Sequence, residues 1–338
     1  MKLQEILSGK FKELESYITP YTHPSKNSFT FHLINDGIKP KNLNKLKQLE
    51  SLLNTKILTH SIDAKIFENL VPWGEGQNYT TYYRLKLASI LPDNIDKCIY
   101  MDSDMLLIGD IKELYNTDLQ GHICGVTGEN RSRTAPMVEL PHNQNFIIDT
   151  KYDFNAGLLL LDLKKWRELD MESKIFNLLK RVRLTDQDAL NIVFNDDILL
   201  LDSRWNCFPV LVQDAPKRAW HCVFKDEETK TTKANSRFSK KEYEQICKEA
   251  KLVHFGGPKP WQRRSYLFPS IDMWKLQSWY FREWWINAAG TPFYRDIVNR
   301  MLEIDSRGIK SRLYRFIKLG DKSFRFFRKK LRGLLSKN

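Results

Sequence analysis

Two aspartates, Asp102 and Asp104, interrupt an apolar run in the stretch CIYMDSDMLLIGDI, residues 98–111. Two carboxylates one residue apart repel each other and are unfavourable in apolar surroundings. At a strand end, side chains at i and i+2 point to the same face, so both carboxylates would reach one ion. Carboxylate oxygens suit Mg²⁺ or Mn²⁺. The pair therefore predicts a divalent-metal site; the alternative is a solvated turn, which the apolar flanks disfavour.

A second candidate is the segment HFGGPKPW, residues 254–261. Its glycines allow the backbone to approach an anion closely, and Lys259 would add a point charge beside a diphosphate. His254 offers a nitrogen ligand, which Mn²⁺ accepts better than Mg²⁺ does. Taken alone, this segment slightly favours the alternative, a Gly-Gly-Pro turn with a surface lysine.

Three further polar residues stand in contexts that suggest binding. Arg84 lies in an otherwise apolar helical pattern, YTTYYRLKL, where it either extends its charge to solvent or meets an anion. Asn155 directly precedes a buried strand in FNAGLLLLDL, where the alternative is a turn asparagine. Asp186 opens a helix in LTDQDALN, where the alternative is ordinary N-capping.

The elements that must position these residues alternate between strands and helices. The pattern predicts strands at 29–36, 56–62, 97–102, 154–163, 197–202 and 251–257. It predicts helices at 41–53, 79–91, 164–181 and 186–194. This alternation indicates an α/β fold with a mainly parallel sheet, in which ligands bind at the carboxyl ends of strands. Asp102, His254 and Gly256 are expected at such ends.

Composition restricts the class of protein. The 338 residues carry a net charge of +13, and residues 306–338 hold twelve Lys or Arg and one acid, hence eleven of those charges. The N-terminal residues lack the apolar core of a signal peptide, and no apolar run reaches membrane-spanning length. Five scattered cysteines without metal-binding spacing indicate reduced thiols and a cytoplasmic protein.

The basic C-terminal segment has helical periodicity. Its apolar residues recur at helical spacing between Ile309 and Leu334, and Lys and Arg occupy the other faces. A basic amphipathic helix with Phe and Leu is typical of a peripheral anchor on an anionic membrane. The alternative is a solvated helix packed on its own domain. Nucleic-acid binding is not expected, because no nucleic-acid motif is present.

The order of the motifs is more specific than any one of them. Arg84, YMDSDML, FNAGLLLLDLKKW, TDQDALN and VHFGGPKPW together resemble glycosyltransferase family 8, the retaining enzymes of the GT-A fold, over about residues 29–262. Within that family the chain is similar to bacterial galactosyl- and glucosyltransferases that extend the lipopolysaccharide core. The resemblance implies a hexosyltransferase that moves galactose or glucose from a UDP-sugar to a lipid-linked oligosaccharide.

The resemblance also implies individual roles. In such enzymes the Asp-x-Asp pair and the late His bind Mn²⁺, which clamps the donor diphosphate; Mg²⁺ is the alternative ion. The implied metal ligands are Asp102, Asp104 and His254. The implied donor-binding residues are Arg84, Asp102, Asn155, Asp186, Gly257 and Lys259. The implied catalytic residues are Asp186 and Gln187, and the acid after the next strand aligns with Glu129.

The family's reaction retains the anomeric configuration of the sugar. Double displacement needs a nucleophile, and the position that would supply it is Gln187, an amide and a poor one. We therefore expect same-face attack by the acceptor, in which the leaving phosphate accepts the acceptor's proton. Asp186 would stabilise the oxocarbenium-like transition state electrostatically.

We expect a catalytic domain over 1–260, an aromatic-rich helical extension over 261–305 and the basic tail over 306–338. In the extension, Trp274, Trp279 and Trp284 are expected to pack a helix onto the sheet rather than to shape an acceptor site. The segment FTFHLIND matches the family's second strand, so the first, base-binding strand is not visible. An upstream start, a diverged N-terminus and lost activity are all consistent with this.

Two other functions remain open. A catalytically impaired family member would bind saccharide or membrane without turnover. A metal-dependent nucleotide phosphotransferase is disfavoured by the absence of a GxxxxGK[ST] loop.

Overall fold

The computed structural model describes residues 29–71, 78–129, 133–139, 144–209, 238–256, 259–261 and 275–300. The first half contains β1 (Thr30–Asn35), α2 (Pro40–Leu53), β2 (Lys56–Ser61), η1 (Ala64–Phe67), η2 (Thr80–Lys86), α3 (Leu87–Ile90), β3 (Lys97–Met101), β4 (Met105–Leu107), α4 (Ile111–Tyr115), β5 (Cys124–Glu129) and β6 (Arg133–Glu139). The second half contains β7 (Gln144–Thr150), β8 (Asp153–Asp162), α5 (Leu163–Glu168), α6 (Met171–Arg181), α7 (Asp186–Phe194), β9 (Ile198–Leu200), α8 (Lys240–Lys248), β10 (Leu252–His254) and α10 (Lys275–Ala289).

The α/β class is confirmed, but the strands of the described part are not mainly parallel. The largest sheet has the order β3-β8-β5-β9, and β8 runs antiparallel to both β3 and β5. Among the pairs of labelled strands in the described residues, only β5–β9 and the separate β1–β2 pair are parallel. The reason is the β6–β7 hairpin, which the sequence patterns did not predict. Parallel neighbours need a crossover connection, whereas a hairpin reverses the chain and returns it antiparallel.

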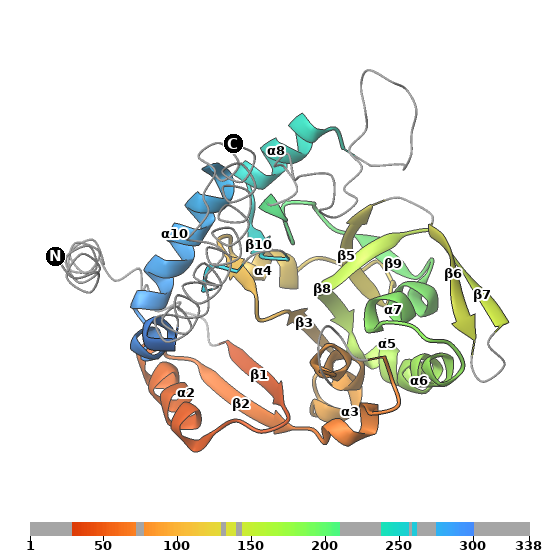
Figure 1. Cartoon of the computed structure of the whole chain (residues 1–338), viewed down its shortest axis with the longest axis horizontal. Helices are drawn as coiled ribbons and strands as arrows, with labels where there is room; N and C mark the ends of the chain where they lie inside the picture. Colours follow the sequence, from red (N-terminus) through yellow and green to blue (C-terminus); the bar gives the residue numbers. More distant parts are fainter. Residues whose placement is uncertain are drawn as a thin grey trace, which may run out of the picture.

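Strand β8 is buried on both faces, which explains its unbroken apolar run. Leu159 and Leu161 pack into a cluster with residues of α5, α6 and α7, including Trp166 and Phe194. Leu158, on the alternate face, packs into a second cluster with residues of α4 and β10. Figure 1 shows α5, α6 and α7 gathered beside β8. A strand covered on both sides reads as continuous apolar sequence rather than as an alternating pattern.

One short strand pair brings two segments that are distant in the sequence together beside this sheet (Figure 1). Strand β4 pairs antiparallel with β10, and the register places His254 opposite Met105. The backbone N–H of Phe255 then donates to the carbonyl of Asp104 at 2.9 Å. Residues 104 and 254 are therefore adjacent because of strand pairing and not because of their side chains alone.

Two predicted helices take a different form. The segment expected at 79–91 is mostly 3₁₀-helix, η2, followed by the single α-turn α3 before Pro92. The helix expected at 164–181 is divided into α5 and α6 by Asp170, whose φ of +47° is left-handed. A left-handed non-glycine residue ends one helix and re-aims the next.

The helix α10 packs through residues that the sequence did not single out. Tyr280 and Phe281 are buried against Cys247, Val253 and Phe255. Trp279, which was expected to pack onto the sheet, is 47% exposed, so that expectation is wrong for this residue.

Two tryptophans of α10 do pack. Trp284 packs against the cluster that contains Leu106 of β4 and Val253 of β10, as expected, and both tryptophans also contact the segment 260–261. Trp284 packs against Trp261 with ring centroids 4.9 Å apart, and Trp285 Nε1 donates to the carbonyl of Pro260 at 3.2 Å. The extension thereby holds the loop that carries Lys259. Trp274 and residues 306–338 lie outside the described residues.

The chain after α10 also contacts α2, the first helix in the described part of the sequence. Asp296 accepts from Lys45 at 2.6 Å and lies 3.1 Å from Lys41, both on α2. Lys45 also lies over the ring of Phe293, 5.3 Å from its centroid.

No helix in the described ranges is both long and apolar enough to cross a membrane.

Asn191 of α7 connects this helix to β8, and its removal should destabilise the fold. Its amide accepts from the N–H of Phe154 and donates to the carbonyl of Phe154, both at 2.9 Å and buried. Asn191→Ala leaves both backbone groups unpaired, and each such group costs about 1–3 kcal/mol. We expect the free energy of unfolding, determined by urea denaturation, to fall by about 2–6 kcal/mol.

The control is Asn287→Ala, which removes an exposed asparagine from α10 and should change stability by less than about 0.5 kcal/mol. A loss in Asn191→Ala no larger than that of the control would contradict the structural role of this amide.

Candidate active site

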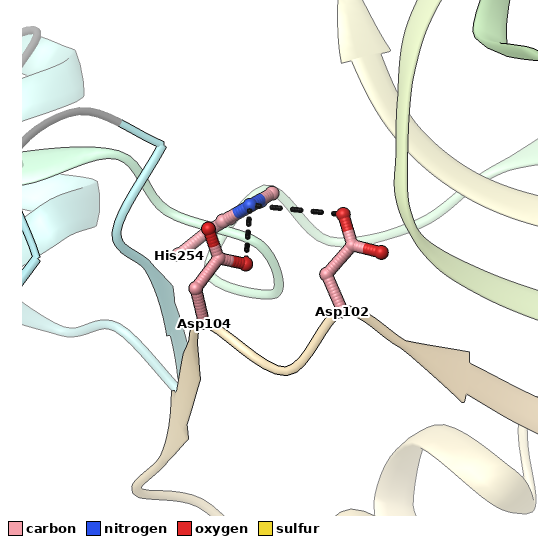
Figure 2. Close-up of side chains that lie close together, drawn as sticks. All are labelled: Asp102, Asp104 and His254. Atoms are coloured by element: carbon pink, nitrogen blue, oxygen red, sulfur yellow. Dashed lines mark ion pairs between the residues drawn. The ribbon is translucent and has the colours of Figure 1, made fainter. Parts of the chain in front are cut away.

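The predicted metal residues come together at the turn between β3 and β4. Asp102 follows β3 directly, Asp104 precedes β4, and His254 ends β10 (Figure 2). His254 Nε2 lies 3.2 Å from Asp104 Oδ1 and 4.0 Å from Asp102 Oδ2. The ligand atoms of all three residues lie within 4.8 Å of one another. The two aspartates flank a turn instead of extending a strand, but their carboxylates converge as predicted.

These distances fit a divalent cation. Two ligands at right angles around an octahedral ion with bonds of about 2.1 Å lie about 3 Å apart, and opposite ligands lie about 4.2 Å apart. The separations of 3.2 and 4.0 Å between His254 Nε2 and the two carboxylates fall within that range. Two carboxylates with one imidazole form a donor set suited to Mn²⁺. The residues present therefore fit the metal that the sequence predicts.

The electrostatics of Asp104 are set by its neighbours. Partial burial raises the pKa of its carboxyl, but hydrogen bonds and the charges of His254 and Lys259 lower the pKa to about 2. The Lys259 ammonium donates to Asp104 Oδ2 and to the carbonyl of Phe255. Lys259 is thus fixed beside the metal pair, as expected for a residue that adds charge at this point.

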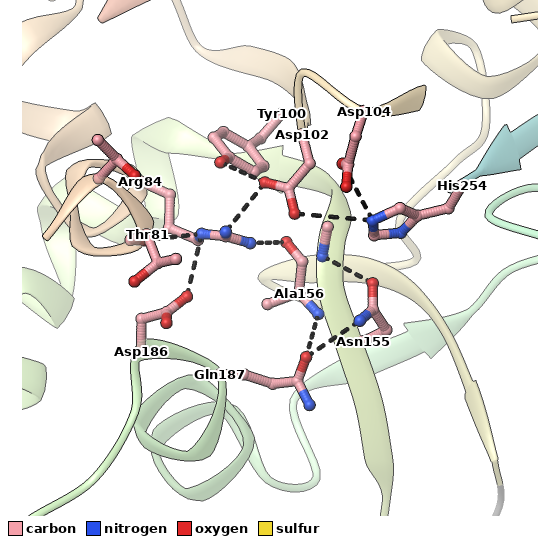
Figure 3. A network of polar contacts seen from close by, with 12 residues as sticks. Thr81, Arg84, Tyr100, Asp102, Asp104, Asn155, Ala156, Asp186, Gln187 and His254 are labelled. Atoms are coloured by element: carbon pink, nitrogen blue, oxygen red, sulfur yellow. Dashed lines mark hydrogen bonds and ion pairs between the residues drawn. The ribbon is translucent and has the colours of Figure 1, made fainter. Parts of the chain in front are cut away.

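Arg84 is the buried centre of the network in Figure 3, with only 4% of its surface exposed. Its Nη2 donates to Asp102 Oδ1 at 2.9 Å, and its Nε lies 3.1 Å from Asp186 Oδ2. The Nη1 group donates to the carbonyl of Ala156, and Nε donates to the carbonyl of Thr81 at 2.9 Å. Arg84 therefore joins the metal turn to the start of α7.

The charge of Arg84 is stabilised despite its burial. Desolvation lowers the pKa of the guanidinium, but the surrounding tyrosine and aspartates raise it above its usual value. Tyr100 contributes twice, because its ring lies 4.6 Å from the guanidinium carbon and its hydroxyl donates to Asp102 Oδ1 at 2.7 Å. Asp102 accepts from both Arg84 and Tyr100, so its orientation is set before any ion arrives.

The side-chain amides of Asn155 and Gln187 form a hydrogen-bonded pair beside the turn that carries Asp102 and Asp104 (Figure 3). Gln187 Oε1 accepts from the N–H of Ala156 at 3.1 Å and from Asn155 Nδ2 at 3.2 Å. Asn155 Oδ1 accepts from the N–H of Gly157 at 2.9 Å. Because the N–H of Asp102 donates to the carbonyl of Gly157 at 2.8 Å, this amide pair and the turn of Asp102 lie side by side.

Asp186 occupies the first turn of α7 but does not cap the helix. Thr185 is the N-cap, with its hydroxyl accepting from the N–H of Asp188 in a capping box. The capping alternative for Asp186 is therefore wrong. Asp186 is 5% exposed; burial raises the pKa of its carboxyl above the usual value, and the charge of Arg84 opposes this shift. A carboxylate that is buried, paired and not needed as a cap is available for another task.

Besides Tyr100, two further residues at this site were missed by the sequence patterns. Asn206 is buried, and its Oδ1 lies 2.8 Å from His254 Nδ1. Gly157 packs so closely that a Cβ there would lie 2.4 Å from His254 Cε1. The available signals were weak: an asparagine in the turn SRWN, where its φ is +64°, and the glycine of FNAG.

Not every predicted residue can be placed. Gly257 lies outside the described residues, and the side chain of Glu129 does too. The structure brings together the remaining predicted residues: Arg84, Asp102, Asp104, Asn155, Asp186, Gln187, His254 and Lys259.

Comparisons with known proteins agree with this geometry. The sequence model described as Glycosyl transferase family 8 matches residues 18–265. General stress protein A of Bacillus subtilis is 26% identical over 240 residues, which cover 68% of this chain and 75% of the relative. A lipopolysaccharide 1,2-glucosyltransferase of Escherichia coli is 24% identical over 281 residues, which cover 81% of this chain and 70% of the relative.

The fold is shared with a solved structure. The galactosyltransferase LgtC in complex with donor and acceptor sugar analogs aligns with a TM-score of 0.52 at 24% identity, over 81% of this chain and 88% of that chain. This likeness confirms the expected GT-A fold. Because the family model covers most of the sequence, the protein belongs to glycosyl transferase family 8 and is an enzyme of the hexosyltransferase class.

Proposed function

We propose that the protein moves galactose or glucose from a UDP-sugar to a saccharide acceptor, with retention of configuration and with Mn²⁺ as the preferred metal. The observation that carries the proposal is the convergence of Asp102, Asp104 and His254 beside the buried Asp186. A diphosphate leaving group needs positive charge, and a glycosyl transition state needs a nearby carboxylate. This site offers both within one network.

The metal ligands and Lys259 would act on the leaving group. When bound, the cation would supply Lewis-acid stabilisation of the departing diphosphate. Asp102 and Asp104 are held for this task by Arg84, Tyr100 and Lys259. The Lys259 ammonium would add positive charge on the same side, and we propose that the neighbouring Gly257 contributes its backbone to the phosphate contact.

Asn155, Asp186 and Gln187 would act on the sugar. The remaining N–H groups of the two amides are available to donate to sugar hydroxyls. Gln187 Oε1 already accepts two N–H groups, which reduces its ability to attack an anomeric carbon. We therefore assign same-face attack by the acceptor, with Asp186 stabilising the developing positive charge. Each of the three guanidinium nitrogens of Arg84 already contacts a protein oxygen, so we assign Arg84 to positioning Asp102 and Asp186.

The acceptor proposal rests on relatives and on sequence. One relative is a lipopolysaccharide glucosyltransferase, so we propose a lipopolysaccharide or lipooligosaccharide acceptor. Such acceptors are lipid-linked, and the basic stripe in residues 306–338 would hold the enzyme peripherally on the anionic inner membrane.

The metal role predicts that neutralising either aspartate abolishes donor turnover. Asp102→Asn and Asp104→Asn preserve size and, at Asp102, the oxygen that Arg84 contacts. We expect UDP release from UDP-galactose or UDP-glucose with Mn²⁺ to fall roughly 100-fold or more, because two anionic ligands are needed to hold the cation. Chelation with EDTA should have the same effect on the parent protein.

The matched control is Asp93→Asn, which neutralises an exposed aspartate away from the site. Its rate should equal that of the parent. Turnover by either site variant within tenfold of the parent would show that the metal role is wrong.

Asp186→Asn separates chemistry from structure at the start of α7. The amide keeps an oxygen for Arg84 Nε and leaves the Thr185 cap intact, so the melting temperature should change by less than about 4 °C. The rate of transfer should fall about 100-fold, as when one transition-state stabiliser is removed. A rate within threefold of the parent, with the protein folded, would assign Asp186 a structural role only.

Removing residues 306–338 should separate membrane binding from donor chemistry. The deletion takes away eleven net positive charges and the apolar stripe. In co-sedimentation, the full chain should bind anionic but not neutral liposomes, and less at high salt, because surface attraction is screened beyond about 8 Å. The truncated protein should remain in the supernatant and still release UDP. Equal sedimentation of both proteins on anionic lipid would contradict the anchor.

A further inference from the structure

A continuous chain of hydrogen bonds runs from the backbone of β8 through Asn155 and Asn206 to the ring of His254. It begins at the N–H of Gly157, which donates to Asn155 Oδ1 at 2.9 Å. A backbone N–H can only donate, so this contact fixes which end of the Asn155 amide is oxygen. The other end, Nδ2, donates to Gln187 Oε1, which is itself fixed as an acceptor by the N–H of Ala156.

Asn206 carries this orientation to the histidine. Its Nδ2 donates to Asn155 Oδ1 at 3.1 Å, so its own Oδ1 must face the other way. That oxygen lies 2.8 Å from His254 Nδ1, and an amide oxygen can only accept. Nδ1 therefore carries the hydrogen. In a neutral imidazole the lone pair is then on Nε2, the nitrogen that faces Asp102 and Asp104.

The ring has little freedom to escape this arrangement. Phe208 packs on one side with ring centroids 4.5 Å apart, and Gly157 is in such close contact that any side chain there would overlap the ring. Asn206 is 4% exposed, and its left-handed φ of +64° is tolerated better by asparagine than by most residues. At position 206, the backbone conformation and the hydrogen bonds therefore both favour an asparagine.

We propose that Asn206 is a positioning residue that holds His254 in the Nδ1–H tautomer, so that Nε2 is the metal-binding nitrogen. The proposal deepens the proposed function and rests on its metal site. It also joins the metal ligand to Asn155, a proposed sugar contact, through one amide. Outer partners of metal-bound histidines act in this way by fixing the tautomer and the ring orientation.

The first test measures Mn²⁺ affinity, from the decrease of the free-ion EPR signal, in the full chain. Asn206→Ala removes the acceptor for Nδ1–H and should weaken binding about 10- to 100-fold. Asn206→Asp keeps an acceptor there and should bind Mn²⁺ at least as tightly as the parent. The same variant loses the donor to Asn155 and should raise the KM for the UDP-sugar about tenfold. The split between metal affinity and KM is one that general destabilisation would not produce.

The matched control is Asn54→Ala. Asn54 also has a left-handed backbone, with a φ of +46°, and lies far from Asn206 in the sequence. This variant tests backbone strain alone and should leave Mn²⁺ affinity unchanged. Parent-like affinity in Asn206→Ala would overturn the proposal, as would lost affinity in Asn206→Asp. If Asn206→Ala does not fold, the Asn206→Asp result decides alone.

The second test does not depend on the metal. Long-range ¹H–¹⁵N NMR of ¹⁵N-histidine protein, metal-free and at alkaline pH, should show His254 with a protonated Nδ1 and a bare Nε2. The signal is identified by its loss in His254→Gln. The opposite tautomer in the parent would overturn the proposal. If the parent binds no Mn²⁺ yet shows the Nδ1–H tautomer, the metal role in the proposed function fails while the positioning by Asn206 stands.

Discussion

Arg84 pairs with Asp102 and Asp186 through one buried guanidinium, and the rest of the site depends on this pairing. Carboxylates held close together repel, and burial adds a desolvation penalty to each. The positive charge of Arg84 offsets the repulsion and the desolvation penalty at Asp102 and Asp186. The charge of Lys259 does the same for Asp104. These carboxylates can therefore lie close together in the folded protein without a bound ion, and they remain able to bind one.

The same pairing explains how distant elements reach one site. Arg84 lies on η2, Asp102 follows β3, Ala156 lies on β8 and Asp186 begins α7. Its contacts tie all four elements together, and the short pairing of β4 with β10 adds His254. The position of each functional group is thus set by backbone contacts and by the charged side chain of Arg84, and less by the surface loops.

Much of the site was predictable because its signals are local. Asp102 and Asp104 are two residues apart in an apolar run, and the segments of Asn155 and Gln187 are short and distinctive, so motif order indicated the family. The strand directions were not predicted, because the β6–β7 hairpin was not recognised among the sequence patterns and tertiary contacts decide strand pairing. The pairing that places His254 joins two strands of three residues, too short for periodicity to identify. Asn206 was missed because a turn asparagine acquires a role only when the turn meets His254.

The central claim is that Asp102, Asp104 and His254 together bind one divalent cation for donor chemistry. The most direct measurement is anomalous X-ray diffraction from crystals of the protein grown with Mn²⁺ and UDP. The account predicts one strong anomalous peak within bonding distance of both carboxylates and of His254 Nε2, with the diphosphate oxygens completing the coordination. A structure with bound UDP and no anomalous peak between these residues, or with His254 binding through Nδ1, would contradict it.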